Sequence, residues 1–79
     1  MRIDKFLKNS RIIKRRTIAK EACDQGRVLV NGKEVKPGHQ LEEGDIIEVK
    51  FGDDSLKLKV LNLLEHVKNN ADTMYEVIS

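Results

Sequence analysis

Cysteine, proline and aromatic residues are scarce in this sequence. Its 79 residues include one cysteine, one proline, no tryptophan and three aromatic side chains. Cys23 therefore cannot form an intramolecular disulfide and has no neighbouring cysteine with which to bind a metal. We expect it to be buried or half-buried, as free cysteines commonly are. The shortage of exposed aromatic residues argues against a surface that stacks single-stranded bases.

Residue patterns for catalysis, metal binding and membrane insertion are also missing. His39 and His66 lie far apart in the sequence and belong to no metal-binding pattern. The serines lack the context of a catalytic nucleophile, and no apolar run reaches the roughly 20 residues that span a bilayer. The charged start is unlike a secretory signal. We therefore expect a non-enzymatic protein without metal or cofactor, located in the cytoplasm and not in a membrane.

Basic residues are concentrated at the start of the chain. Residues 1–40 contain eleven lysines and arginines and four acidic residues, a net charge of +7, whereas residues 41–79 contain four and nine, a net charge of −5. The first twenty residues alone hold eight basic residues and a single acid, Asp4. A chain of this length has room for one domain, residues 1–79. Such asymmetry favours a basic face that binds a polyanion.

A first helix is predicted over residues 2–9, where apolar side chains recur with i, i+3, i+4 spacing. Phe6 lies on this apolar stripe, so we expect it in the core and not on a base-stacking surface. Asp4 suits the positive end of the helix dipole and is expected to pair with Lys8 one turn later. Its predicted role is structural.

A second helix is predicted over residues 17–25, with Gly26 as the residue that ends it. Ile18 and Ala22 are expected on its apolar side. The three adjacent basic residues 14–16 oppose the dipole at the start of this helix, where a helix selected for stability alone would carry acids. A locally unfavourable choice of this kind is typical of a functional site. We interpret it as phosphate binding.

The remainder of the chain predicts strands joined by tight turns. Asn31 and Gly32 form the dipeptide most favoured in a two-residue hairpin turn, and residues 52–55 form another turn. Residues 63–67 could form a helical turn or continue a strand, and residues 66–72 are predicted to be a loop. The strands are predicted at residues 28–30, 33–35, 46–51, 56–60 and 74–78.

The order of these features resembles the S-four RNA-binding domain, also called the alpha-L motif. A basic helical pair, the glycine that ends the second helix, the segment RVLVNGKEV and the later segment LEEGDIIEV occur in the family's order. The resemblance implies an RNA-binding core over residues 1–51, with the strands of residues 52–79 completing the sheet. One departure is Arg15, which stands where the family usually has a small capping serine. The matching residues are Arg2, Asp4, Lys5, Leu7, Arg16, Ala19, Gly26, Val28, Val30, Asn31, Gly32, Gly44, Asp45 and Val49.

A closer resemblance covers nearly the whole chain. The opening MRIDKFLKNSRIIKRRTIAKE and the ending MYEVI are similar to small bacterial factors of ribosome-associated quality control, which are paralogues of the fifteen-kilodalton heat-shock protein. This resemblance implies binding to ribosomal RNA and tRNA on large ribosomal subunits obstructed by peptidyl-tRNA. It also implies that the chain assists the addition of C-terminal alanine tails with an NEMF-family partner. The alternative within the family is recycling of stalled subunits without tailing.

The elements and the resemblance together predict an α+β fold, in which two N-terminal helices pack on a small, mostly antiparallel sheet of four to five strands. We expect a module, monomeric off the ribosome, that clamps the phosphates of a folded RNA. The residues expected to contact RNA are Arg2, Lys5, Lys14, Arg15, Arg16, Lys20, Asn31 and Lys33.

Two other classes of function remain open. A protein-interaction module would use the acids of the second half to bind a basic protein. An RNA-modifying enzyme would need a catalytic domain that 79 residues do not contain. The acids in question are Glu42, Glu43, Asp45, Asp53 and Asp54.

Overall fold

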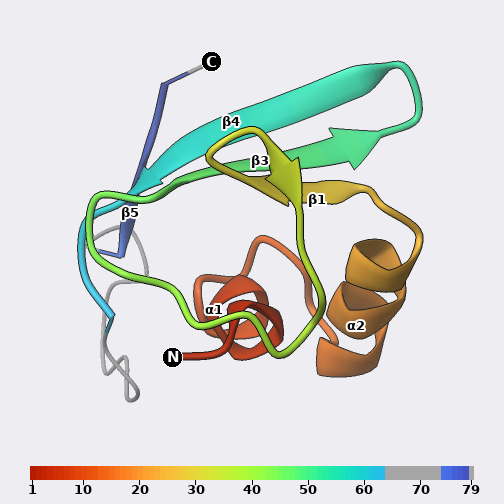
Figure 1. Ribbon diagram of the computed structural model, residues 1–79, viewed down its shortest axis with the longest axis horizontal. Coiled ribbons are helices and arrows are strands. Elements are labelled where there is room, and N and C mark those ends of the chain that lie inside the picture. Colours follow the sequence, from red (N-terminus) through yellow and green to blue (C-terminus); the bar gives the residue numbers. More distant parts are fainter. Residues whose placement is uncertain (64–73, 79) are drawn as a thin grey trace.

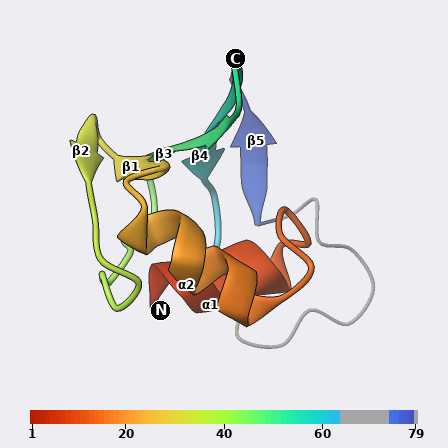
Figure 2. The same ribbon diagram turned by 90° about the vertical axis from the view of Figure 1, so that its right-hand side faces the viewer.

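The computed structural model describes residues 1–63 and 74–78, which form two helices and a five-stranded sheet. The strands are antiparallel and lie in the order β2-β1-β3-β4-β5. Both helices cover the same side of the sheet, so the fold has two layers (Figure 1, Figure 2). This confirms the predicted fold class. In chain order the elements are α1 (Ile3–Asn9), α2 (Arg16–Asp24), β1 (Val28–Val30), β2 (Lys33–Glu34), β3 (Ile46–Phe51), β4 (Asp54–Val60) and β5 (Tyr75–Val77).

The register of the central strands places apolar side chains on one face of the sheet. Val28 lies opposite Val49, Val30 lies opposite Ile47, and Ile47 lies opposite Leu58 on the next strand. All five side chains are buried. Because successive residues of a strand point to opposite faces, the other face carries the polar residues of the same strands.

Helix α1 supplies the other half of the core. Ile3, Phe6 and Leu7 are fully buried, as the apolar spacing predicted. Lys57 and Lys59 are exposed on β4, in agreement with the strict alternation of that strand. Since their neighbour Leu58 is buried toward the helices, both lysines lie on the open face of the sheet.

The predicted strands and turns are largely confirmed. Residues 31–32 form a tight turn in which Asn31 has φ 53° and Gly32 has φ 85°. The turn predicted at residues 52–55 is shorter than expected, because β4 already begins at Asp54 and pairs there with Phe51. The helical turn considered around residues 63–67 and the loop predicted at residues 66–72, with His66, lie mostly or wholly outside the described residues.

The prediction for the apolar side of α2 was wrong for Ile18 and right for Ala22, which is partly buried against the core. Ile18 is 49% exposed, whereas Ala19 and Cys23 are buried. The buried side is therefore rotated by one residue relative to the prediction, and α2 packs through small side chains. Small side chains allow close approach to α1, and Arg16, one turn before Ala19, lies on the side of α2 that faces the first helix.

Residues 37–41 fasten the N-terminal end of α1. The backbone N–H of Ile3 donates to the carbonyl of His39 at 2.9 Å, and that of Asp4 donates to Pro37 at 3.3 Å. The first N–H groups of a helix have no partner within the helix, so these carbonyls satisfy two of them. The position of Asp4 is thus fixed by the connection between β2 and β3 as well as by its own helix.

Gly26 ends α2 in a backbone conformation that other residues rarely adopt. Its φ is +73°, its N–H donates to Cys23, and the N–H of Arg27 donates to Ala22, which is the hydrogen-bond pattern of a Schellman motif. A Cβ at this position would also collide with the flexible side chain of Glu34.

We therefore expect Gly26→Ala to lower the free energy of unfolding by about 1–2 kcal/mol, the cost of a left-handed residue with a Cβ. In a domain of this size the melting temperature should fall by roughly 5–15 °C, measured by circular dichroism. Gly38→Ala is the matched control, because a Cβ at Gly38 meets only ordinary contacts at 3.6 Å or more. Equal melting temperatures for the two variants would contradict the prediction.

Candidate nucleic-acid interface

The candidate interface is organised by one buried carboxylate. Asp4 lies in the first turn of α1, between buried apolar neighbours, and its side chain is 0% exposed. Removing a carboxylate from water costs several kcal/mol unless it is paired and hydrogen-bonded. The chain meets this requirement with two arginines from different elements, Arg2 at the start of α1 and Arg16 at the start of α2.

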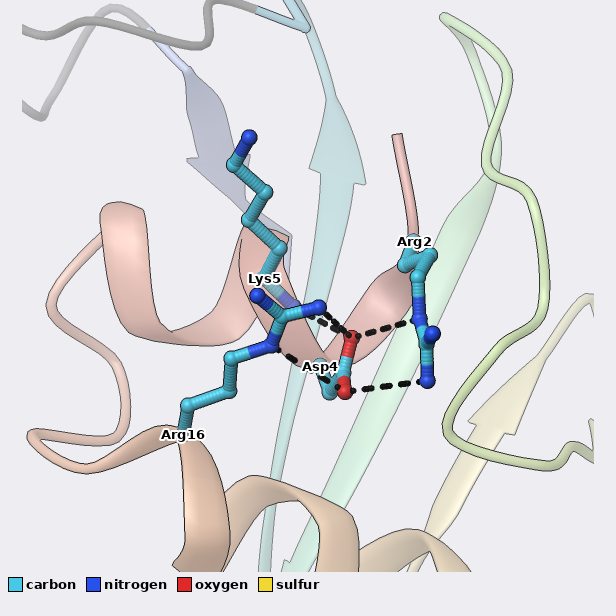
Figure 3. A network of polar contacts seen from close by, with 4 residues as sticks. All are labelled: Arg2, Asp4, Lys5 and Arg16. Carbon is cyan, nitrogen blue, oxygen red and sulfur yellow. Dashed lines mark hydrogen bonds and ion pairs between the residues drawn. The ribbon is translucent and has the colours of Figure 1, made fainter.

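The guanidinium groups of Arg2 and Arg16 contact the Asp4 carboxylate from opposite sides (Figure 3). Arg2 places Nε 3.3 Å from Oδ1 and Nη2 3.4 Å from Oδ2 of Asp4. Arg16 places Nε 3.3 Å from Oδ2 and Nη2 3.4 Å from Oδ1. The backbone N–H of Lys5 adds a bond of 2.8 Å to Oδ1. The four guanidinium contacts are each longer than the best charge-assisted bonds, so stability comes from their convergence.

This arrangement holds two positive groups next to each other at the surface. The side chains of Arg2 and Arg16 are each 45% exposed. A guanidinium has five N–H donors, and the contacts to Asp4 involve only Nε and Nη2 of each arginine. The remaining donors can bind a second anion, and the fork of an arginine matches a phosphate well.

The start of α2 adds a second cationic feature. Its N-cap is Arg15, at the position where the sequence departs from the capping serine of the resembled family, and no side chain caps the helix. Thr17 lies inside the helix, which begins at Arg16. Lys14, Arg15 and Arg16 are exposed around this end, where the positive pole of the helix dipole also favours an anion.

The other predicted contact residues divide between the two layers. Lys20 is exposed on α2, one turn after Arg16. The side chain of Lys5 is half-buried and points away from the Asp4 carboxylate (Figure 3). Asn31 and Lys33 belong to the β1–β2 hairpin in the sheet layer (Figure 2).

The amide of Asn31 has a structural task within that hairpin. Its Nδ2 donates to Asp45 at 3.2 Å, and its Oδ1 accepts from the backbone N–H of Ile46 at 3.0 Å. The side chain thereby ties the hairpin turn to the start of β3. An RNA contact by Asn31 stays a prediction.

The structural role predicted for Asp4 is correct, but its partners were not predicted. A local pairing with Lys8 was expected, but the described partners of the carboxylate are Arg2, Arg16 and the Lys5 backbone. Arg16 is 12 residues away, so no local pattern reveals the contact. The available signal was that Asp4 is the single acid among the first twenty residues and lies beside the apolar stripe.

Cys23 of α2 is buried, as predicted, with an exposed fraction of 3%. Burial raises the pKa of its thiol from 9.0 to about 11, with further contributions from the negative charges of Asp4 and Asp24. Between about pH 9 and pH 11 the thiol of the folded protein therefore keeps a proton that the thiol of the unfolded chain releases. The stability from this thiol is therefore complete below about pH 9 and is lost as the pH rises toward 11.

We accordingly expect Cys23 to resist alkylation. Because the pKa of the buried thiol is about 11 and not 9.0, its thiolate fraction at pH 8 is about a hundredfold lower than in the unfolded chain, and the thiolate is the reactive form. Iodoacetamide should label the native protein at least a hundredfold more slowly than the protein in 6 M guanidinium, which serves as the control. Labelling at similar rates would contradict the prediction.

The described residues contain no cluster of His, Cys, Asp or Glu that could hold a metal ion. In the same part of the chain no helix is long and apolar enough to cross a membrane. The cations described above lie on α1, on α2 and in the turn between them.

The chain is similar to several known proteins. Residues 1–47 match the model of the S4 domain. An RQC P-site tRNA stabilizing factor from Halalkalibacterium halodurans is 51% identical over 78 residues, which cover 98% of this chain and 89% of that protein. The protein of the same name from Bacillus subtilis is 44% identical, with 99% and 92% covered. Heat Shock Protein 15 of Vibrio cholerae, solved as a trimer, superposes with a TM-score of 0.91 at 26% identity and covers 100% of this chain and 82% of that one.

Proposed function

The chain belongs to the S4 domain family and, within it, to the RQC P-site tRNA stabilizing factors, and we propose on this basis that it binds RNA on large ribosomal subunits that retain peptidyl-tRNA in the P site. The RQC P-site tRNA stabilizing factors are RNA-binding factors and not enzymes. A factor of this kind works in the cytoplasm, where ribosomes are.

The observation that carries the proposal is the pair of arginines held by one buried aspartate. Asp4 fixes Arg2 and Arg16 beside each other while leaving each side chain 45% exposed. Lys14, Arg15 and Lys20 are exposed on the same helical layer. A surface preorganised in this way loses little side-chain entropy when it binds phosphates.

The same surface favours folded RNA over single strands. Single-strand platforms depend on exposed aromatic side chains, whereas recognition of folded RNA depends on shape and on contacts to the backbone. Of the two phenylalanines, Phe6 is fully buried, and Phe51 is 48% exposed at the far end of β3, in the sheet layer. The helical layer offers cations instead, which suits ribosomal RNA and tRNA.

We further propose that the chain acts as a single module, monomeric off the ribosome, and assists alanine tailing by an NEMF-family factor. The second candidate, which the resemblance to the fifteen-kilodalton heat-shock protein implies, is recycling of stalled subunits without tailing. Tail length on stalled nascent chains, measured with and without the protein in the presence of the tailing factor and alanyl-tRNA, separates the two. Light scattering separates the monomer from a trimer.

Co-sedimentation with isolated large subunits tests the proposal directly. Lys14→Glu/Arg15→Glu reverses two exposed charges of the surface, and Lys57→Glu/Lys59→Glu makes the same charge change on the open face of the sheet. The wild type and the Lys57→Glu/Lys59→Glu variant should sediment with subunits that carry P-site tRNA. The Lys14→Glu/Arg15→Glu variant should remain in the supernatant. Equal sedimentation of the two variants would contradict the proposed interface.

The acidic residues of the second half of the chain test the alternative that the protein is a protein-interaction module. Charge reversal at Glu42 and Glu43, both exposed, should leave sedimentation with the subunits intact. A loss of binding in this variant, with the Lys14→Glu/Arg15→Glu variant unaffected, would instead support a protein-interaction module.

A further inference from the structure

Arg11 has a backbone conformation that, among the described residues, is otherwise adopted only by glycines and one asparagine. Six of the described residues have positive φ, and four of them are glycines. A fifth is Asn31, a residue type that adopts this region readily and whose amide is anchored to Asp45 and Ile46. The sixth is Arg11, with φ 64°.

The position of Arg11 is one where glycine is usual. Ser10 is the C-cap of α1, so Arg11 is the first residue after the cap, the place at which helices commonly end in a left-handed glycine. Holding a residue with a Cβ there is unfavourable. No described carboxylate pairs with Arg11, and its side chain is exposed. Within the described structure, no contact of the Arg11 side chain thus offsets the cost of its backbone conformation.

The turn presents this arginine rigidly. The N–H of Arg11 donates to Lys8 at 3.0 Å, and the N–H of Ile13 donates to Leu7 at 3.1 Å. Ser10 before it and Ile13 after it are buried, with exposed fractions of 2% and 9%. The backbone is thus fixed on both sides while the charged side chain extends into water, which is the arrangement expected of a preorganised contact.

From this exception we propose that Arg11 is a further phosphate-contacting residue of the RNA interface, extending it from α1 and α2 along the turn that joins them. The inference rests on the proposed function, because an exposed arginine needs an anionic partner to justify its conformation. Lys14 and Arg15 continue the same turn, so the phosphates that Arg11 would bind belong to the same RNA.

Arg11→Gly provides a test in which stability and binding change in different directions. Glycine fits φ 64° without strain, so the melting temperature should stay unchanged or rise. Affinity for fluorescently labelled tRNA, measured by anisotropy, should fall about three- to tenfold. The slope of log affinity against log salt should decrease in magnitude by about 0.7–0.9, because one phosphate contact is lost. Arg11→Asn also tolerates this backbone and should behave in the same way.

Two controls make the outcome decisive. Arg11→Lys retains the charge and should retain most of the affinity for tRNA. Lys57→Ala removes an exposed charge from the open face of the sheet and should bind tRNA within about twofold of the wild type. If Arg11→Gly binds like Lys57→Ala while Arg16→Ala is weakened, Arg11 is no contact and the proposed function stands. If Arg16→Ala is also unaffected, the interface itself is wrong. A lower melting temperature for both Arg11→Gly and Arg11→Asn would show that the arginine stabilises this turn, and would contradict the proposal.

Discussion

Replacing Asp4 with asparagine is expected to lower the free energy of unfolding by about 2–3 kcal/mol, since two guanidinium groups would then face each other without the carboxylate between them. Removing one partner of a buried pair typically costs about 3–5 kcal/mol, and a somewhat smaller loss is expected here because both arginines are half exposed and can turn into water. The melting temperature should fall by roughly 10–20 °C.

The same substitution should weaken RNA binding although it adds one positive charge. Without the carboxylate, Arg2 and Arg16 lose their fixed geometry, so the affinity for labelled tRNA should fall about tenfold while its salt dependence does not decrease. Asp24→Asn is the matched control, because it makes the same charge change at an exposed position at the end of α2. If the two variants have equal stability and equal affinity, Asp4 does not position the arginines.

Arg16→Ala is expected to weaken the binding of structured RNA by about 1–3 kcal/mol, the range for losing a hydrogen-bonding partner that carries a charge. This corresponds to a loss of affinity between about fivefold and 150-fold. Arg2→Ala should have a similar effect, because the two arginines contact Asp4 with equivalent geometry. Fluorescence anisotropy with labelled tRNA measures both.

Arg16→Lys distinguishes the contribution of the positive charge to RNA binding from that of the guanidinium geometry. Arg16→Lys keeps the charge, so the salt dependence should remain, but an ammonium group cannot grip both oxygens of Asp4 and present a fork to a phosphate at the same time. Its affinity should therefore lie between those of the wild type and Arg16→Ala. Unchanged affinity in a folded Arg16→Ala variant would remove this residue from the interface.

The local elements could be predicted because they depend on local patterns. The stripe of Ile3, Phe6 and Leu7 predicts α1, and the Asn31-Gly32 dipeptide predicts the first hairpin. The basic residues crowded into the first twenty positions, together with the resemblance to the S-four domain, suffice to predict a nucleic-acid surface.

The arrangement within the surface could not be predicted in the same way. Whether Ile18 or Ala19 faces α1 depends on how closely two helices pack, which the periodicity of nine residues does not determine. The ion pair between Asp4 and Arg16 forms only when those helices meet, so it is a tertiary contact without a local signature. The positive φ of Arg11 likewise has no signal in a residue type that rarely adopts it.

The dependence of tRNA affinity on salt concentration tests most directly whether these cations bind phosphates. Each phosphate neutralised contributes about 0.7–0.9 to the slope of log affinity against log salt, so engagement of four to six cations predicts a slope of roughly −3 to −5. Arg16→Ala should bring that slope closer to zero by about one unit. A wild-type slope near zero would show that the basic surface binds something other than RNA phosphates.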